Sequence, residues 1–283
     1  MKKILITGKN SYIGTSLERW LLKHPDTYKV ETLDLLNEDW KSHNFSNYDV
    51  VFHVAGIAHI KETPENNNLF YRVNHDLTLE VAKKSKEAGV KQFIFLSSMS
   101  VYGLEAGFIT KETIPTPNTA YAKSKLAAEI ELAKIRANNF KIAILRPPMV
   151  YGANCKGNYP RLSTLSKKIP FFFDSGNSRS MIYIENLCEF VKQIIDSFSA
   201  GLFFPQNKEY VNTADMVKTI AKSHGKAIRL IKIPRYIIKF FNISLFNKVF
   251  GNLCYDFSLS NSITFNYNIV DFETSVHKTE SNS

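Results

Sequence analysis

The stretch TGKNSYIG, residues 7–14, decides how the first half of this chain folds. It joins a short apolar run, typical of a buried strand, to the amphipathic run Ile13–Lys23, which is typical of a helix. Gly8 permits a tight turn, and Gly14 lets the helix pack closely against the sheet. Ser11 is a small residue that stands where the three-glycine phosphate-binding pattern has its middle glycine. This context predicts a turn that holds a phosphate at a helix N-terminus.

Short apolar runs alternate with helical patterns along the first half of the chain. The predicted strands are Lys3–Thr7, Lys29–Asp34, Asp49–Ala55, Gln92–Ser97 and Lys141–Leu145. The predicted helices are Ile13–Lys23, Asn74–Ala88 and Thr119–Asn138, the last with Thr119 as its capping residue. This alternation predicts an α/β fold with a doubly wound parallel sheet. Only about fifteen residues separate Asp34 from Asp49, so one crossover between strands is abbreviated.

Beyond Ala153 the elements become shorter and more mixed, and prolines interrupt them. We therefore expect a smaller C-terminal α/β lobe that makes one return to the main sheet. The first domain is predicted to comprise residues 1–155 and a return segment at about 180–205. The smaller lobe is predicted to comprise residues 156–179 and 206–283, ending in a polar tail at 275–283.

The chain is basic, with a net charge of +10 that favours anionic partners. Its lysines are scattered, as on a solvated surface, and its arginines are not interleaved with aromatic residues, so we expect no nucleic-acid partner. No secretory signal and no apolar run of the roughly 20 residues that span a bilayer are visible. Residues 228–250 either pack within the lobe or form an amphipathic surface for weak peripheral contact with a membrane.

The cysteines and histidines show no metal-ligand spacing. Cys155, Cys188 and Cys254 are expected to be inert free thiols in a reducing cytoplasm. His53 lies within a predicted buried strand and is expected to be a hydrogen-bonded core residue. We therefore expect no metal site.

A second motif, YAKSK, places Tyr121 and Lys125 on one face of a predicted helix. An ammonium beside a phenol stabilises the phenolate and lowers its pKa from about 10. Bringing that pKa near 7 requires roughly 4 kcal/mol of differential stabilisation, at about 1.36 kcal/mol per unit. One ammonium is not expected to supply this alone, so a positively charged ligand ring would have to contribute. The spacing alone is weak evidence, because a chain this rich in tyrosine and lysine contains such pairs by chance.

The position of YAKSK supports a chemical role. The strand QFIFLSSMSVYG, residues 92–103, carries Ser97, Ser98 and Ser100 at its carboxyl end, where α/β sheets bind ligands. Tyr121 follows about twenty residues later. Asp34 ends another predicted strand, where an acid can bind both hydroxyls of a ribose.

Together with three further motifs, these features resemble the extended short-chain dehydrogenase/reductase family, which is also the NAD-dependent epimerase/dehydratase family. The resemblance covers most of the chain. It rests on TGKNSYIG, on HVAG (residues 53–56), on Asn74 in VNHDLT, on SSMSVYG (97–103), on YAKSK (121–125) and on RPPMVYG (146–152). It implies a Rossmann-like domain, an NAD or NADP cofactor and the homodimer common in this family.

The resemblance also implies roles for individual residues. Ser98, four places before Tyr102, is the catalytic hydroxyl, Tyr121 is the acid/base, and Lys125 holds the nicotinamide ribose and tunes Tyr121. The residues implied for cofactor binding are Gly8, Lys9, Ser11, Tyr12, Ile13, Gly14, Asp34, Leu35, Val54, Ala55, Gly56, Asn74, Tyr121, Lys125, Pro147 and Met149. These roles suit hydride transfer at a sugar carbon, with the proton moving through Tyr121.

The second half resembles the branch of the family that works on nucleotide sugars, which implies a UDP-sugar substrate. The residues expected to contact it are Ser98, His59, Asn158, Arg161 and Arg179, with Lys156 beside them. Arg179, in NSRSMIYIENL, matches the family arginine that binds the nucleotide-sugar phosphate, whereas Lys156 and Arg161 could equally be solvated surface charges. The family commonly has Asp where this chain has Asn186, so the hydrogen bonding there is expected to differ.

Two enzymatic reactions fit these residues. A 4-epimerase oxidises C4, allows the keto sugar to rotate so that its other face meets the cofactor, and returns the hydride to C4. Its NAD therefore stays bound. A 4-ketoreductase consumes one reduced cofactor per turnover, and the abbreviated crossover after Asp34 favours such exchange. Lys9 favours the 2′-phosphate of NADP, whereas the carboxylate of Asp34 repels it.

The second half also resembles proteins that make bacterial capsule and O-antigen sugars. That group includes reductases of UDP-2-acetamido-2,6-dideoxy-4-hexuloses, and we favour this reaction over that of a UDP-glucose or UDP-N-acetylglucosamine 4-epimerase. A third hypothesis is a regulator that binds a dinucleotide without catalysis. The intact set of Ser98, Tyr121 and Lys125 argues against it.

Overall fold

The computed structural model describes residues 1–58, 60–233, 249–260 and 265–281. The chain forms two compact units. The first comprises Met1–Gly103, Pro115–Pro147 and Leu187–Pro205, and the second comprises Leu104–Ile114, Pro148–Asn186 and Gln206–Ser283. Residues 104–114, 148–155 and 180–186 therefore lie in the second unit, although the sequence pattern groups them with the first domain.

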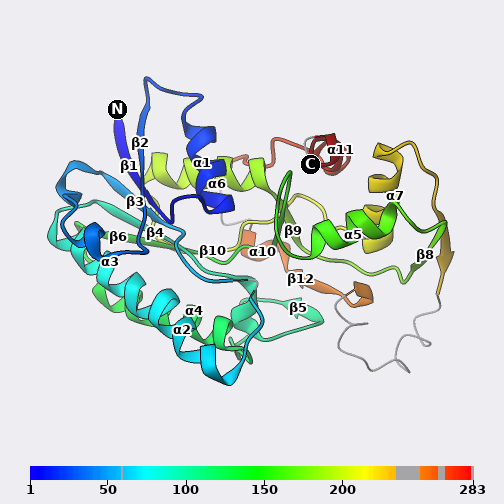
Figure 1. The fold of residues 1–283 in the computed structure, drawn as a ribbon, viewed down its shortest axis with the longest axis horizontal. Helices are drawn as coiled ribbons and strands as arrows, with labels where there is room; N and C mark the ends of the chain where they lie inside the picture. The colour runs from blue at the N-terminus through cyan, green and yellow to red at the C-terminus, as the bar shows by residue number, and fades with distance from the viewer. Residues whose placement is uncertain (59, 234–248, 261–264, 282–283) are drawn as a thin grey trace. The chain divides into compact units, whose positions relative to one another are not determined.

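A six-stranded parallel sheet forms the centre of the first unit (Figure 1). Its strands lie in the order β10-β6-β4-β3-β1-β2. Their bounds are β1 Lys2–Thr7, β2 Tyr28–Leu33, β3 Val50–His53, β4 Gln92–Leu96, β6 Lys141–Leu145 and β10 Gly201–Phe203. The predicted fold class is confirmed, and β10 is the last strand that the chain adds to this sheet. The strand order reverses between β1 and β3, and ligands of such sheets bind at the carboxyl ends of the strands on either side of this reversal.

Helices cover both faces of this sheet. α1 (Tyr12–Leu21) and α6 (Ile184–Ser197) lie on one face, while α3 (Leu77–Glu87) and α4 (Ala120–Ile135) lie on the other (Figure 1). Because both faces are covered, the central strands are apolar along their length, and every residue of β3 and β4 is buried.

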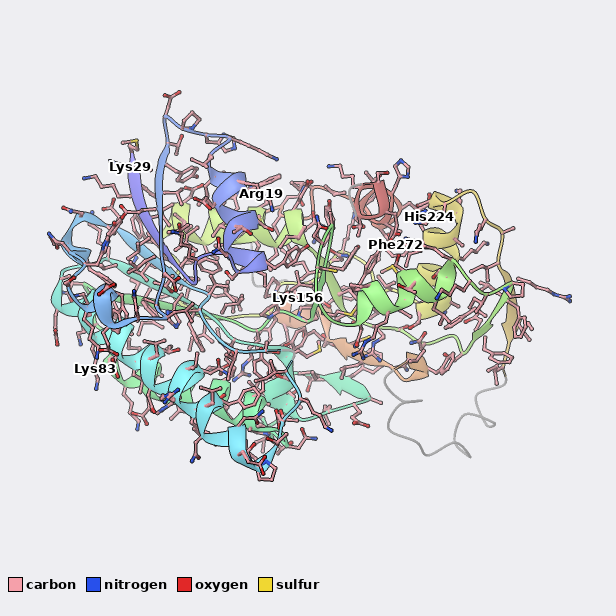
Figure 2. All side chains as sticks on the ribbon, viewed as in Figure 1. Arg19, Lys29, Lys83, Lys156, His224 and Phe272 are labelled. Carbon is pink, nitrogen blue, oxygen red and sulfur yellow. The ribbon has the colours of Figure 1, made fainter. Side chains whose placement is uncertain are left out.

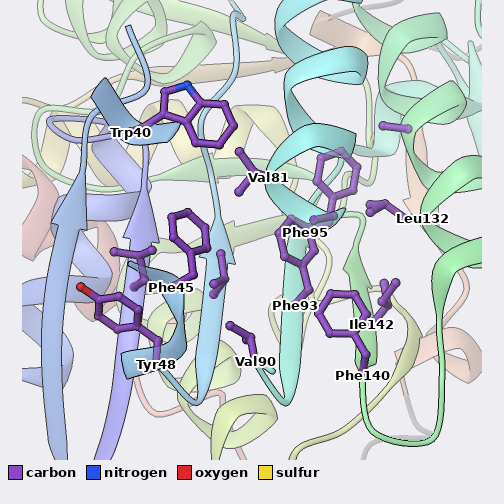
Figure 3. Packing of buried hydrophobic residues seen from close by; sticks show 14 residues of the cluster. Trp40, Phe45, Tyr48, Val81, Val90, Phe93, Phe95, Leu132, Phe140 and Ile142 are labelled. Atoms are coloured by element: carbon purple, nitrogen blue, oxygen red, sulfur yellow. The ribbon is translucent and has the colours of Figure 1, made fainter. Parts of the chain in front are cut away.

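The connection between β2 and β3 contains no α-helix, which confirms the predicted short crossover. It contains two 3-10 turns, Glu38–Lys41 (η1) and Phe45–Asn47 (η2). Trp40, Phe45 and Tyr48 pack into the hydrophobic cluster formed by the sheet, α3 and α4 (Figure 3). Three aromatic side chains thus provide the packing that a crossover helix would otherwise provide.

The helix predicted over Asn74–Ala88 begins earlier than expected. It starts as α2 (Asn67–Tyr71) and passes through a π-helical turn, Arg72–Asp76 (η4), before continuing as α3. Such single π turns occur often at functional sites, because they redirect a side chain from the helix. Here the turn contains Asn74.

The helix α4 begins as predicted and ends earlier than predicted. The Oγ1 of Thr119 accepts a hydrogen bond from Ala122 N at 3.1 Å, which confirms the predicted cap. The helix ends at Ile135 rather than at Asn138. Residues 137–140 instead form a tight turn closed by two backbone hydrogen bonds between Ala137 and Phe140.

The second unit is built from short elements. Its strands pair in parallel as β5 Gly107–Ile109 with β12 Leu253–Tyr255, β7 Met149–Tyr151 with β9 Met181–Tyr183, and β8 Phe171–Asp174 with β11 Arg229–Lys232. Its helices include α5 Asn158–Ser166, α7 Thr213–Ser223, α10 Phe257–Ser260 and α11 Phe272–Ser281. One apolar core of this unit contains Phe172, Ala214, Val217, Ala221 and Ile228.

The polar tail predicted at 275–283 is wrong, because residues 272–281 form the helix α11. The buried carboxylate of Glu280 accepts hydrogen bonds from Ser163 Oγ at 2.8 Å and His224 Nε2 at 2.6 Å. Ser275 Oγ lies 2.6 Å from the hydroxyl of Tyr151. This polar sequence packs as a partly buried helix because several of its polar groups find partners.

Charged side chains are spread over both units, as predicted for a solvated basic surface. Arg19, Lys29 and Lys83 in the first unit and Lys156 in the second are all exposed (Figure 2). The three cysteines are buried free thiols.

Candidate active site

The predicted phosphate turn lies between β1 and α1. Gly8 has a φ of +96°, and a Cβ on it would lie 2.8 Å from the backbone N of Ala55. Asn10 also has a positive φ, 65°, which asparagine tolerates better than most residues. Ser11 caps α1, because its Oγ accepts a hydrogen bond from Gly14 N at 3.2 Å. The serine at the middle position thus serves as the helix cap.

Glycines permit close packing near the ends of β1 and β3. A Cβ on Gly14 would lie 3.1 Å from Val54 Cγ1, so α1 packs directly on the sheet. A Cβ on Gly56 would lie 2.9 Å from Asn74 Oδ1 and 3.3 Å from Lys125 Nζ. Glycines that permit close backbone approach beside a helix N-terminus are what the pyrophosphate of a dinucleotide requires, so the residues present fit such a cofactor.

An open hollow of about 340 Å³ lies beside this turn. It is lined by Lys9, Thr32, Leu33, Asp34, Asn37, Asp39, Trp40, Ser42 and His43. Asp34 Oδ1 accepts a hydrogen bond from Leu36 N at 3.0 Å, and Lys9 is exposed. Leu35, which the sequence predicts beside the cofactor, packs against the hydrophobic cluster. The hollow thus presents one lysine and two carboxylates where the adenosine end of a dinucleotide would lie.

Ser98 and Tyr121 meet at the carboxyl end of β4. Ser98 caps the 3-10 turn Met99–Tyr102 (η5), and its Oγ accepts hydrogen bonds from the N and Oγ of Ser100 at 3.1 and 3.0 Å. Burial raises the pKa of the Tyr121 phenol, and a side-chain hydrogen bond with Ser98 opposes this rise only in part. The phenol is therefore protonated at neutral pH.

Lys125 lies one helical turn after Tyr121, and only 4% of it is exposed. Its Nζ donates a hydrogen bond to Leu96 O at 2.9 Å and lies 4.6 Å from the centre of the Phe95 ring. Burial lowers the pKa of this ammonium to about 8, although the charge of Glu129 raises it. An ammonium carries three donors, so further hydrogen atoms remain for the hydroxyls of a ribose.

Asn74 joins the loop after β3 to the helix that carries Tyr121. Its Oδ1 accepts a hydrogen bond from Ile57 N at 2.9 Å, and its Nδ2 donates to Ile57 O and Ser124 Oγ, each at 3.2 Å. Both amide hydrogens of this fully buried side chain are therefore used within the protein. We expect Asn74 to affect the cofactor through the loop and helix that it joins.

His53 is a hydrogen-bonded core residue, as predicted. Thr78 Oγ1 donates its proton to Asn74 O at 2.9 Å, so it accepts from His53 Nε2 at 3.0 Å. His53 Nδ1 is then the acceptor for the Thr7 hydroxyl at 2.8 Å. Burial lowers the pKa of His53 to about 3, so the imidazole is neutral and links β1, β3 and α3.

A buried ionic network behind the site was not predicted from the sequence. Arg146 Nε lies 3.1 Å from both carboxylate oxygens of Glu129, and its Nη1 donates to the Tyr102 hydroxyl at 2.8 Å. Ser97 Oγ also donates to Glu129. The network therefore fixes the ends of β4 and β6 to α4. Its only sequence signal is that Glu129 follows Lys125 by one helical turn.

The predicted substrate residues Arg179, Asn158 and Arg161 lie in the second unit. Arg179 Nη1 donates to Gly251 O at 3.0 Å, and burial lowers the pKa of its guanidinium. No carboxylate among the residues that the structure describes forms an ion pair with it. Asn158 and Arg161, at the start of α5, are exposed. His59 lies outside the described residues.

Two further predicted positions lie close together in the chain, where it passes from the first unit to the second. Pro147 O accepts a hydrogen bond from Met99 N at 2.9 Å in the first unit, and Met149 begins β7 in the second.

Asn186 is fully buried: its Oδ1 accepts from Ile269 N at 3.1 Å and from Val270 N at 3.0 Å, and its Nδ2 donates to Val270 O at 3.0 Å. An ionised aspartate could not donate this last bond, which accounts for the asparagine.

Within the described ranges, no group of three or more His, Cys, Asp or Glu could hold a metal ion. Across the same part of the chain, every helix is too short or too polar to cross a bilayer. Most of residues 228–250, the segment considered for membrane contact, lies outside the described residues.

Fold and site together define an enzyme of the extended short-chain dehydrogenase/reductase class with a nicotinamide dinucleotide cofactor. A comparison with family models agrees, because residues 4–203 match the NAD dependent epimerase/dehydratase family. The chain belongs to this family.

Relatives with known names include both epimerases and reductases. A UDP-glucose 4-epimerase of Vibrio cholerae is 32% identical over 88% of this chain and 83% of its own length. An N-acetyl-α-D-glucosaminyl-diphospho-ditrans,octacis-undecaprenol 4-epimerase of Escherichia coli O157:H7 is 25% identical over 82% of this chain and 75% of its own.

Solved structures share the fold. The UDP-glucuronic acid 4-epimerase of Bacillus cereus, in complex with NAD, has a TM-score of 0.75 at 20% identity, covering 99% of this chain and 98% of its own. The dTDP-4-dehydrorhamnose reductase of Clostridium acetobutylicum has a TM-score of 0.76 at 20% identity, covering 98% of both chains.

Proposed function

We propose that this protein reduces the 4-keto group of a UDP-2-acetamido-2,6-dideoxy-4-hexulose in the cytoplasm, as a step toward a surface polysaccharide. Family membership and the meeting of Ser98 with Tyr121, one turn before Lys125, support hydride transfer at a sugar carbon. The half-buried Arg179, which has no carboxylate partner among the described residues, supports an anionic diphosphate as part of the substrate.

In this proposal each residue has one task. Ser98 Oγ donates a hydrogen bond to the keto oxygen, and Tyr121 transfers its phenolic proton to the same atom as it becomes a hydroxyl. The reduced nicotinamide, when bound, supplies the hydride for C4. The ammonium of Lys125 stabilises the phenolate that remains on Tyr121 and binds the ribose hydroxyls.

The observation that favours reduction over epimerisation is the short crossover between β2 and β3. It consists of two 3-10 turns, and it leaves the adenosine hollow open beside Lys9 and Asp34. An open adenosine site suits a cofactor that must leave after every turnover. The raised pKa of Tyr121 agrees with this direction, because a ketone reductase begins its cycle with a protonated donor.

The test is to supply the UDP-4-keto-6-deoxy sugar with NADH or NADPH and to follow the loss of reduced cofactor by absorbance. The proposal predicts one cofactor oxidised per sugar consumed. If no cofactor is oxidised while UDP-glucose or UDP-N-acetylglucosamine is converted to its C4 epimer, reduction is the wrong reaction.

A 4-epimerase is the second candidate, and the Vibrio cholerae relative favours it. The same serine, tyrosine and lysine serve both reactions. The two differ in the fate of the cofactor, so an epimerase should retain NAD through gel filtration and a reductase should release it.

We also infer a preference for NAD(H) over NADP(H). The carboxylates of Asp34 and Asp39 both line the adenosine hollow and repel a 2′-phosphate, and Lys9 is the single lysine in that lining. Asp34→Ala should therefore improve the ratio of kcat/KM for NADPH to that for NADH. Lys9→Ala should change kcat/KM for NADH little. A native preference for NADPH that Lys9→Ala abolishes would contradict this assignment.

A further inference from the structure

Glu62 holds the start of the helix that carries Tyr121. It lies in the loop between β3 and the 3-10 turn Pro64–Asn66 (η3), and it is partly buried. Its Oε2 accepts a hydrogen bond from Ala120 N at 2.9 Å, and its Oε1 accepts one from Tyr121 N at 3.0 Å. One carboxylate thus binds the first two N–H groups of α4.

This carboxylate supplies a charge that the helix itself lacks. The first turn of α4 contains no acidic residue, and the Thr119 side chain satisfies a different group, Ala122 N. A helix N-terminus carries roughly half a positive charge, which a nearby carboxylate compensates. Glu62 provides that compensation from a distant part of the chain.

The peptide of Tyr121 is also held from its carbonyl side. Tyr121 O accepts a hydrogen bond from Ser124 Oγ at 2.8 Å, and Ser124 Oγ accepts from Asn74 Nδ2. Asn74 in turn holds Ile57. Ile57 and Glu62, on either side of one loop, are therefore both tied to the first turn of α4.

We infer that Glu62 is a positioning residue for the reaction, whose carboxylate fixes the Tyr121 peptide and sets the potential in which the phenol exchanges its proton. It acts through Tyr121 and through the start of α4. The inference rests on the proposed function only in taking Tyr121 as the acid/base.

The test compares Glu62→Gln with Glu65→Gln. Glutamine keeps the size of Glu62 and removes its charge, while Glu65, in the adjacent turn η3, is an exposed acid with no bond to α4 among the described residues. Removing a negative charge favours the phenolate. The apparent pKa assigned to Tyr121 in the pH dependence of the rate should therefore fall by roughly 0.2–0.7 unit. We expect kcat to fall roughly 10- to 100-fold, with the dissociation constant of the cofactor changed less than about twofold. Glu65→Gln should match the wild type in each respect.

Two further measurements separate positioning from simple stability. Glu62→Asp keeps the charge but shortens the side chain, so it should lower kcat and leave that apparent pKa in place. NMR of tyrosine labelled at its phenol carbon follows the titration of Tyr121 without turnover, with its signal assigned as the one lost in Tyr121→Phe. That signal should titrate at lower pH in Glu62→Gln.

An unchanged titration of Tyr121 in Glu62→Gln would overturn the inference, even if the melting temperature fell, because a merely structural role lowers stability without moving that titration. If the wild type turns over no sugar, the proposed function fails. The NMR measurement still decides the role of Glu62 in that case.

Discussion

Tyr121 and Lys125 share one helical face, and burial favours the uncharged form of both. The phenol is protonated at neutral pH, whereas the ammonium keeps its charge up to about pH 8. The pair therefore combines a proton donor with a cation that can stabilise the phenolate left after donation.

Replacing Tyr121 with phenylalanine should remove turnover and spare the cofactor. The variant loses the only proton that this account delivers to the sugar oxygen, and such a donor contributes roughly 10²–10⁴-fold to the rate. Steady-state rates and a cofactor titration check this. Retained activity would refute the assigned role, and lost cofactor binding would mean that the substitution disturbed the site as a whole.

The pKa of Lys125 predicts a pH limit on activity. The group is charged below about pH 8 and neutral above it. A neutral amine holds the ribose and the phenolate more weakly, so kcat/KM for the cofactor should decline as the pH rises through that value. Lys125→Met should be much less active and lose this limb. A wild-type kcat/KM for the cofactor that stays constant from pH 7 to about pH 9.5 would contradict this prediction.

Among the elements, the turn between β1 and α1 depends on a backbone shape that favours glycine. Gly8 has a φ of +96° and approaches Ala55, whereas Gly89, with a φ of +80°, has nothing within 4 Å of an added Cβ. Alanine at either position strains the backbone by about 1 kcal/mol. Gly8→Ala adds an overlap with backbone, which costs on the order of 1–3 kcal/mol more.

Denaturant unfolding and cofactor titration of these two variants provide the test. Gly8→Ala should be the less stable variant and should lose cofactor binding, while Gly89→Ala keeps it. Equal stability and equal cofactor affinity in both variants would show that the turn does not need bare backbone.

The helix α11 should depend on Glu280. Burial alone would raise the pKa of this carboxyl, but hydrogen bonds from His224 and Ser163 and the ion pair with Lys167 lower it overall. A lowered pKa stabilises the fold above the unfolded value of 4.5, and this contribution is lost as the pH falls through the folded value.

Glu280→Ala should destabilise the protein by on the order of 2 kcal/mol, less than a fully buried pair, because His224 and Lys167 are partly exposed. The loss should shrink as the pH falls below the unfolded value of 4.5 and on through the lower folded value, where the native carboxyl becomes protonated. Chemical unfolding at several pH values measures both effects. A loss that does not depend on pH would show that the charge is not involved.

At the scale of the whole molecule, local spacing predicts the sheet and the placement of the proposed catalytic residues on one strand end and one helix face, whereas their roles follow from the family resemblance. TGKNSYIG, the serines after β4 and YAKSK each lie within one turn or one strand end, so their geometry follows from strand and helix periods. The short crossover was predictable for the same reason, since chain length alone limits what fits between Asp34 and Asp49.

Contacts between distant residues were not predictable in this way. Glu62 binds a helix almost sixty residues away in the chain, and Glu129 pairs with Arg146 across α4 and β6. These residues are of common types at unremarkable spacings, so only the fold brings them together. The polar helix α11 was missed because its stability comes from its partners and not from an apolar stripe.

The central claim is net reduction at C4 through Tyr121, and deuterium transfer tests it most directly. Incubation of the UDP-4-keto-6-deoxy sugar with NADH deuterated at the transferring position should give a product with one deuterium on C4, and Tyr121→Phe should give none. A product without deuterium, or a UDP-hexose whose C4 configuration inverts with no net oxidation of NADH, would contradict the account.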